Sequence, residues 1–215
     1  MRLILASASP RRAELLRAAG FDFDVMPTNV DESMRAGESP YAYVRRLAAD
    51  KSAAGLAALK GCARAVTTVG TVRETPIAQA FSPADAIVLG ADTAVVVDGD
   101  ILGKPRDDED AAAMLRRLSG RRHDVMTGVS LRHGAYEVGR VETTGVIFTA
   151  LSDEDVKWYV ASGEGRDKAG AYAIQGLASR FIPRIEGSYS NVVGLPVACV
   201  AELLRDFSTT RSVMP

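Results

Sequence analysis

Residues 87–102 read IVLGADTAVVVDGDIL, and this stretch decides the fold class. Residues 87–97 are mostly apolar, as in a buried strand, and Asp98-Gly99 is typical of a hairpin turn whose second strand is residues 101–102. On both sides of this stretch, short apolar runs alternate with segments of helical periodicity, without internal repeats. This alternation predicts an α/β fold.

Proline and side-chain hydroxyl groups mark the predicted helix starts. Ser9-Pro10 follows a strand at residues 2–6 and begins a helix at 10–19, with the Ser9 hydroxyl as its N-cap. Ser39-Pro40 begins a second, longer helix, and Ser152-x-x-Asp155 is a capping box that begins another. The remaining expected elements are a helix that starts near Asp107, paired strands at 125–131 and 138–149, and a last helix from near Pro196.

The chain is long enough for one well-buried core. It has 215 residues, of which 47% are hydrophobic, so residues 1–207 are predicted to form a single domain. Between residues 61 and 83 the periodicity lapses into Thr, Gly, Pro and isolated charges, which predicts a mobile insertion within that domain. The last residues, 208–215, are predicted to be a flexible tail.

Composition excludes several classes of protein. The 26 basic and 27 acidic side chains nearly cancel, so no nucleic-acid partner is expected. The two cysteines, Cys62 and Cys199, lack the spacing of a zinc site or a disulfide framework. The N-terminal apolar run is shorter than the core of a signal peptide, and no stretch approaches the roughly 20 apolar residues that span a bilayer. We therefore expect a cytoplasmic protein with no membrane partner.

The segment Ser7-Ala8-Ser9-Pro10-Arg11-Arg12 is a candidate anion site. It joins a strand to a helix, so backbone N–H groups, the hydroxyls of Ser7 and Ser9, and the two guanidinium groups converge at the positive end of the helix dipole. The alternative is that Ser9 only caps the helix and that both arginines are solvated.

Asp92 is the main candidate for catalysis, because a buried carboxylate is costly unless it is paired, protonated or bound to a metal. Alternatively, it caps a turn at the end of its strand. Together with Glu32 it could hold Mg²⁺ or Mn²⁺ against a phosphate. Lys51 continues the apolar stripe of its helix, as a side chain that emerges at a site would, and Lys104 follows the hairpin; both could neutralise a polyphosphate. Either lysine could instead be an ordinary surface residue.

Residues 167–176 read DKAGAYAIQG and are dense in small residues that allow a backbone to approach a ligand. Asp167 and Lys168 precede Tyr172, whose ring could stack on a base, and Gln175, whose amide could read a base edge. The alternative is a bulged strand with a core tyrosine. The histidines His123 and His133 have no metal-ligand spacing, so structural or surface roles are favoured.

Five motifs together resemble the Maf family of nucleotide pyrophosphatases, in the family's order and over nearly the whole chain. They are Ser7-Ala-Ser-Pro-Arg-Arg12, Gly90-Ala-Asp-Thr93, Gly103-Lys-Pro105, Leu118-Ser-Gly120 with His123 and Thr127, and Asp167-Lys-Ala-Gly-Ala-Tyr172 with Gln175-Gly176. The resemblance implies a mixed twisted sheet like that of the inosine-triphosphate pyrophosphatases, two lobes around a deep cleft, a homodimer and a divalent cation. It also implies that Asp92 is the proton acceptor and that Arg11, Thr93 and Gln175 select the base.

Within the family, residues 171–176, AYAIQG, are similar to those of the branch that acts on dTTP and UTP. The branch that prefers 7-methyl-GTP carries an acidic residue where Gln175 stands. The expected activity is therefore house-cleaning hydrolysis of pyrimidine nucleoside triphosphates, some of them modified, to the monophosphate and pyrophosphate. Residues 61–83 depart from the family's usual, shorter connection. Two alternatives stay open: a nucleotidyltransferase, although its GxGxR loop is missing, and a regulatory nucleotide-binding protein that restrains septation.

Overall fold

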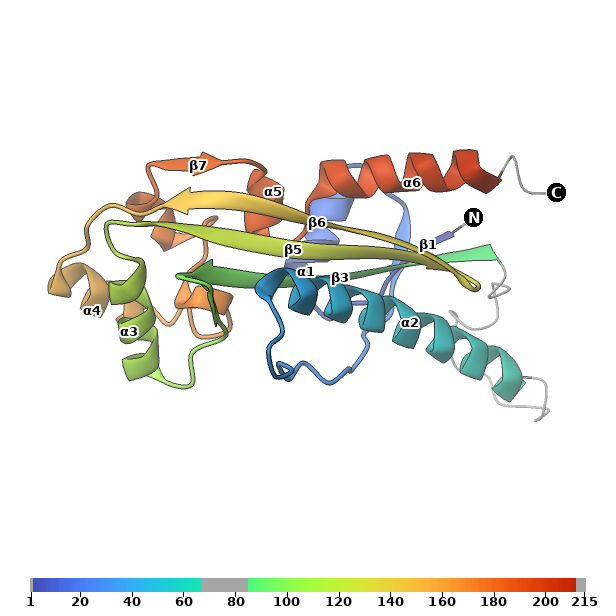
Figure 1. The fold of residues 1–215 in the computed structure, drawn as a ribbon, viewed down its shortest axis with the longest axis horizontal. Helices are drawn as coiled ribbons and strands as arrows, with labels where there is room; N and C mark the ends of the chain where they lie inside the picture. The colour runs from blue at the N-terminus through green and yellow to red at the C-terminus, as the bar shows by residue number, and fades with distance from the viewer. Residues whose placement is uncertain (1, 67–84, 212–215) are drawn as a thin grey trace.

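The computed structural model describes residues 2–66 and 85–211 (Figure 1). In this part of the chain seven strands form one mixed sheet. They are β1 (Arg2–Leu5), β2 (Phe23–Val25), β3 (Ala86–Val97), β4 (Asp100–Leu102), β5 (Arg122–His133), β6 (Tyr136–Ile147) and β7 (Arg184–Glu186). The order is β2-β1-β3-β5-β6-β7, with β4 paired to β3. Strand β1 is parallel to β2 and β3, and the other pairs are antiparallel. The predicted α/β class with a mixed sheet is confirmed.

The helices cover both faces of the long strands (Figure 1). They are α1 (Pro10–Ala18), α2 (Pro40–Val66), α3 (Asp108–Leu118), α4 (Asp153–Ala161), α5 (Tyr189–Val193) and α6 (Val197–Arg211), with the short 3₁₀ turns η2 (Ala169–Ala171) and η3 (Leu177–Phe181). Helix α2 lies along one side of β3 and β5, and α6 lies on the other side. Helices α3 and α4 gather at the opposite end of the long strands from α6. None of the described helices is both long and apolar enough to cross a membrane.

Alternation along β3 assigns its side chains to the two faces of the sheet, because successive strand residues point in opposite directions. Ile87 and Leu89 pack in one cluster with residues of α1 and α6. Ala86 and Val88 pack in another with Leu56 of α2. The same alternation places Asp92 on the α2 face and Thr93 on the opposite face.

Two glycines let α2 lie directly against the sheet. A Cβ atom at Gly90 would lie 2.2 Å from the carbonyl oxygen of Ala48, and one at Gly128 would lie 2.1 Å from that of Val44. Both distances are far below van der Waals contact, so no side chain fits at either position. Because the helix backbone approaches this closely, side chains on the adjoining face of α2 reach the residues of β3.

Most of the predicted local signals are confirmed. Asp98 and Gly99 have φ angles of 55° and 85°, as a tight hairpin turn requires. The Asp107 side chain caps α3 by accepting from the backbone of Asp110, and Ser152 forms the predicted capping box of α4. Ser9 occupies the N-cap position of α1 but its hydroxyl makes no capping bond, which corrects that prediction. The hydroxyl of Ser7 instead accepts from the Ser9 backbone N–H at 3.1 Å.

Two helices extend beyond their expected ends. Helix α2 continues to Val66, through the first residues of the expected insertion, because the glycine at 61 costs only about 1 kcal/mol in a helix whose neighbours favour it. Helix α6 continues to Arg211, so residues 208–211 of the expected tail are helical. The remaining residues of both predictions, 67–83 and 212–215, lie outside the described part of the chain.

Candidate active site

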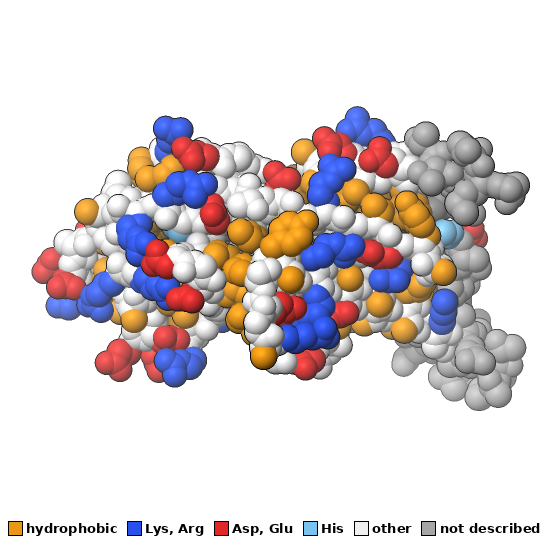
Figure 2. Space-filling model, viewed as in Figure 1, with side chains coloured by type: hydrophobic (Ala, Val, Ile, Leu, Met, Phe, Trp, Pro, Cys, Tyr) orange, Lys and Arg blue, Asp and Glu red, His pale blue; other side chains and the backbone are white. Residues whose placement is uncertain are grey.

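A cavity of about 600 Å³ brings together every predicted site residue. Its walls come from the β1–α1 junction, the loop between β2 and α2, the helix α2, and the strands β3 and β4. Residues from the segments 103–104, 167–175 and 192–194 complete them. The predicted residues on these walls are Ser7, Ser9, Arg11, Arg12, Glu32, Lys51, Asp92, Thr93, Lys104, Asp167, Lys168, Tyr172 and Gln175. On the face of the molecule in Figure 2, basic and acidic side chains are interspersed. We therefore expect the side chains that line the cavity to decide the binding of a charged ligand, rather than the mixed charges on that face.

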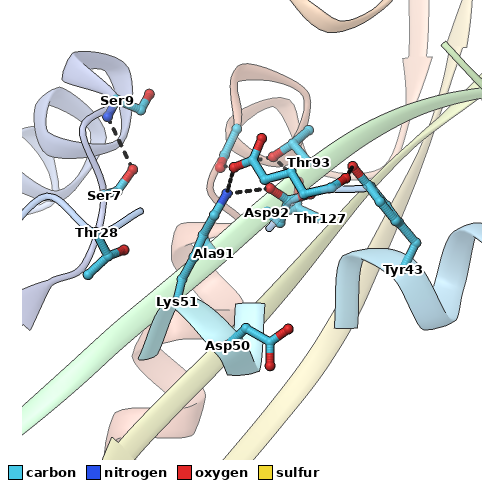
Figure 3. A network of polar contacts seen from close by, with 12 residues as sticks. Ser7, Ser9, Thr28, Tyr43, Asp50, Lys51, Ala91, Asp92, Thr93 and Thr127 are labelled. Carbon is cyan, nitrogen blue, oxygen red and sulfur yellow. Dashed lines mark hydrogen bonds and ion pairs between the residues drawn. The ribbon is translucent and has the colours of Figure 1, made fainter. Parts of the chain in front are cut away.

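Lys51 contacts two carboxylates that line the cavity, and Figure 3 shows its contact with Asp92. Its Nζ atom lies 2.7 Å from Oδ1 of Asp92 and 2.6 Å from Oε1 of Glu32. Asp92 is only 7% exposed, whereas the side chain of Glu32 is 56% exposed. The contact follows from the alternation of β3, which turns Asp92 toward α2, and from the close approach of α2 at Gly90. The neighbouring Asp50 points away from this group.

The environment separates the two carboxylates in acidity. Burial raises the pKa of Asp92 above its ordinary value, although the charges of Lys51 and Arg12 oppose this shift. For Glu32 burial also acts upward, but the hydrogen bond and charge of Lys51 and the charge of Lys104 outweigh it, so its pKa is lowered. Asp92 is therefore the more basic of the two carboxylates and the better placed to accept a proton.

The same two carboxylates have the chemistry that a divalent cation requires. The carboxylates of Asp92 and Glu32 contact the same Nζ atom of Lys51, so they lie close together. Among the described residues no group of three or more His, Cys, Asp or Glu side chains could form a complete metal cage. Mg²⁺ is usually held by one or two carboxylates together with substrate phosphates, and Asp92 with Glu32 fits that arrangement.

Arg12 and Thr93 form a buried network on the other face of β3. Arg12 is 8% exposed and donates to the backbone oxygens of Ala91 at 2.6 Å and Gly194 at 2.9 Å. It also donates to the hydroxyls of Ser7 and Thr93. Four of the five guanidinium N–H groups are thus bonded within the protein. Arg12, predicted to bind substrate, lines the cavity mainly as the residue that ties α1 to β3 and to the end of α5.

Arg11 differs from its neighbour because it remains accessible in the cavity. Its NH2 group lies 3.1 Å from Oδ2 of Asp167, and the two side chains are 24% and 68% exposed. Asp167 also pairs with Lys168. The hydroxyl of Ser9, which caps no backbone group, lies at the N-terminal end of α1 beside Arg11. These groups keep the features of an anion site.

Another part of the cavity wall is the segment predicted to contact a base. Gln175 is exposed on this wall, and Lys104 is exposed nearby. Tyr172 is only 5% exposed, and its ring packs edge-on against His123 and Phe148. Its hydroxyl lies 2.8 Å from Nε2 of His123, which is itself buried, in line with the structural role expected for that histidine. Tyr172 is thus a core tyrosine within a 3₁₀ and turn region rather than in a bulged strand, and its ring supports the wall.

Sequence reasoning missed several residues that line the cavity, among them Tyr43, Thr28 and Gly194. Tyr43 donates to the backbone oxygen of Glu32 at 3.0 Å, and burial with the charges of Asp92 and Glu32 raises its pKa to about 12. It precedes Lys51 by eight residues on α2, so helical spacing could have placed both on one face. Gly194 acts through its carbonyl oxygen, for which no side-chain signal exists.

Comparison with known proteins shows which family the chain belongs to. The family model described as Maf-like protein matches residues 2–207. A protein of Anaeromyxobacter dehalogenans named dTTP/UTP pyrophosphatase is 48% identical, with 95% of this chain and 93% of that protein covered. A protein of the same name from Vibrio cholerae is 46% identical, with 96% and 98% covered. The solved structure of the Staphylococcus aureus Ham1 protein matches with a TM-score of 0.44 at 12% identity, over 98% of this chain and 100% of that chain. On the extent of the family match and the identity to these relatives, the chain belongs to the Maf-like protein family.

Proposed function

We propose that this protein hydrolyses dTTP and UTP to the nucleoside monophosphate and pyrophosphate, the activity for which its relatives are named. The observation that carries the proposal is the buried carboxylate of Asp92, held by Lys51 in a cavity whose other walls supply cations and an exposed amide. A triphosphate needs several positive partners, and a hydrolase needs a positioned base; this cavity combines both.

In the proposed reaction, a water molecule attacks the α-phosphorus. Asp92 accepts the proton of that water, for which its raised pKa suits it. The bond between the α-phosphorus and the bridging oxygen breaks, and pyrophosphate leaves with the electron pair. Arg11, Lys104 and Lys168 bind the phosphates, and Lys51 keeps Asp92 in place and offsets the charge that develops on the α-phosphate.

Asp92 and Glu32 are the residues that would hold Mg²⁺ or Mn²⁺ together with the phosphates. Bound there, the cation would neutralise phosphate charge and polarise the phosphorus toward attack. Removal of divalent cations by EDTA is expected to abolish turnover, and added Mg²⁺ or Mn²⁺ is expected to restore it.

Selection of the base is assigned to Gln175, which lines the same cavity as the phosphate-binding residues and is exposed there. An amide presents one acceptor and two donors, so it can pair with the carbonyl and N–H groups on the edge of uracil or thymine. A substituent at carbon 5 does not change that edge, so modified pyrimidines such as 5-methyl-UTP are included.

The test is pyrophosphate release from dTTP, UTP, CTP, GTP, ATP, 5-methyl-UTP and 7-methyl-GTP by the wild type and by Asp92→Asn. We expect release mainly from dTTP, UTP and 5-methyl-UTP, and a fall in kcat of about 10²- to 10⁴-fold in the variant, since general-base catalysis contributes about that much. Asp50→Asn is the matched control, because Asp50 adjoins Lys51 but pairs only weakly, at 3.6 Å, with Arg46. Hydrolysis of no nucleotide by the wild type would refute the proposed function, and near-normal turnover of Asp92→Asn would remove Asp92 from the mechanism.

A further inference from the structure

The segment of residues 173–178, here called the reading segment, carries Gln175 and is held at both ends by two side chains from outside it. At its start, the backbone N–H of Ala173 donates to the hydroxyl of Tyr159 at 3.0 Å. At its end, the backbone N–H groups of Leu177 and Ala178 donate to the carboxylate of Glu164 at 3.0 and 3.4 Å. The Tyr159 hydroxyl donates to the same carboxylate at 2.7 Å, so the two anchors are linked.

The carboxylate of Glu164 lies directly against the backbone of the reading segment. A Cβ atom at Gly176 would lie 1.9 Å from Oε1 of Glu164. Gly176 follows Gln175 directly, so the carboxylate lies against the backbone next to the residue assigned to the base. A side chain at 176 would displace either the carboxylate or the segment.

Tyr159 provides a rigid support for this arrangement. It belongs to α4, whose start is fixed by the capping box of Ser152 and Asp155, and its side chain is 1% exposed. Burial and the hydrogen bond with Glu164 raise the pKa of its hydroxyl, which therefore stays protonated. The hydroxyl can then serve as donor to Glu164 and acceptor from Ala173 at the same time.

We propose that Tyr159 and Glu164 are positioning residues that set the place of the Gln175 amide and thereby the preference for the base. The inference rests on the proposed function. Neither residue lines the cavity, so both act through the reading segment. Recognition by an amide requires placement to within about 0.5 Å, and a loop without its anchors samples a wider range. The chemistry at Asp92 uses other elements, β3 and α2, so the effect falls on binding and discrimination rather than on turnover.

The test compares kcat and KM for UTP and CTP in Tyr159→Phe and Glu164→Gln. We expect KM for UTP to rise about tenfold in each variant, the usual effect of one lost hydrogen bond, with kcat within about threefold of the wild type. The ratio of kcat/KM for UTP to that for CTP is expected to fall by a similar factor. Ser152→Ala is the control, because it weakens the start of the same helix without touching the reading segment, and it should leave KM and the ratio unchanged.

A double variant separates positioning through Gln175 from a general loss of structure. If the anchors act through that amide, Tyr159→Phe combined with Gln175→Ala should discriminate no worse than Gln175→Ala alone. Additive losses in the double variant, or an unchanged UTP-to-CTP ratio in both single variants, would overturn the inference and leave the proposed function standing. A wild type that hydrolyses no nucleotide would overturn both.

Discussion

Arg11 and Arg12 adjoin each other in sequence, yet the structure predicts opposite effects when each is replaced by methionine. Arg12→Met removes a buried group that satisfies two backbone carbonyls and two hydroxyls. The carbonyl of Gly194 keeps the Thr93 hydroxyl as a donor, at 3.3 Å. A buried carbonyl left without a donor costs about 1–3 kcal/mol, and the other lost hydrogen bonds add to this cost. Part of the cost is offset because the charge no longer needs to be buried. We expect a loss of about 2–4 kcal/mol in the free energy of unfolding. The Arg11–Asp167 pair is partly exposed, so Arg11→Met should cost less than about 1 kcal/mol.

Urea unfolding, followed by the fluorescence of the single tryptophan, Trp158, measures both losses. For a slope of about 2 kcal/mol per molar urea, the Arg12→Met midpoint should fall by about 1–2 M, and that of Arg11→Met should barely move. Steady-state kinetics should show the reverse order, with KM for UTP raised about tenfold in Arg11→Met because a phosphate partner is lost. If Arg12→Met unfolded at the wild-type midpoint and raised KM as Arg11→Met does, Arg12 would be a substrate ligand and the assignment to the scaffold would be wrong.

Three further predictions concern acidity and packing. In a plot of kcat/KM against pH, the acid limb should lie above the ordinary carboxyl range, because the pKa of Asp92 is raised. The residual activity of Lys51→Met should show this limb at still higher pH, because Lys51 lowers the pKa of Asp92. Gly90→Ala should lower the free energy of unfolding by about 3 kcal/mol, because the added Cβ atom meets a backbone carbonyl of α2. Gly61→Ala, on the open side of α2, should raise the free energy of unfolding by about 1 kcal/mol. Thermal unfolding measures both changes. Burial lowers the pKa of His123 to about 4, so the unfolded state binds more protons than the folded state as the pH falls from about 6.5 toward 4. The free energy of unfolding should therefore fall by about 3 kcal/mol over that range. Urea titrations across the range should show that His123→Gln lacks this loss.

The features predicted correctly are those whose cause lies within a few residues of sequence. The hairpin at Asp98-Gly99 and the capping box from Ser152 to Asp155 are decided by local backbone geometry and local hydrogen bonds. Lys51 was identified because helical spacing placed a charge in line with an apolar stripe. The ends of α2 and α6 were placed too early because composition is a weak guide to where a helix stops.

The features that were not predictable depend on partners far away in sequence. The scaffold role of Arg12 depends on the carbonyl of Gly194, 182 residues later, and on that of Ala91, 79 residues later. The anchors of the reading segment, Tyr159 and Glu164, bind backbone N–H groups, which almost every residue possesses. A pattern of residue types therefore could not indicate these two anchors. It did single out residues 167–176, several of which line the cavity.

The register of β3 decides both the packing of α2 and the place of the Asp92 carboxylate. Gly90 and Asp92 lie on the same face of β3, and Gly128 of β5 is paired directly with Asp92. Because only glycine fits beneath α2 at positions 90 and 128, a shift of β3 or of β5 by one residue would place a side chain of that strand against the helix backbone. The shift of β3 would also exchange Asp92 for Ala91 or Thr93 beside Lys51. The close contact that holds α2 to the sheet thus also excludes the registers in which the carboxylate would face away from its lysine.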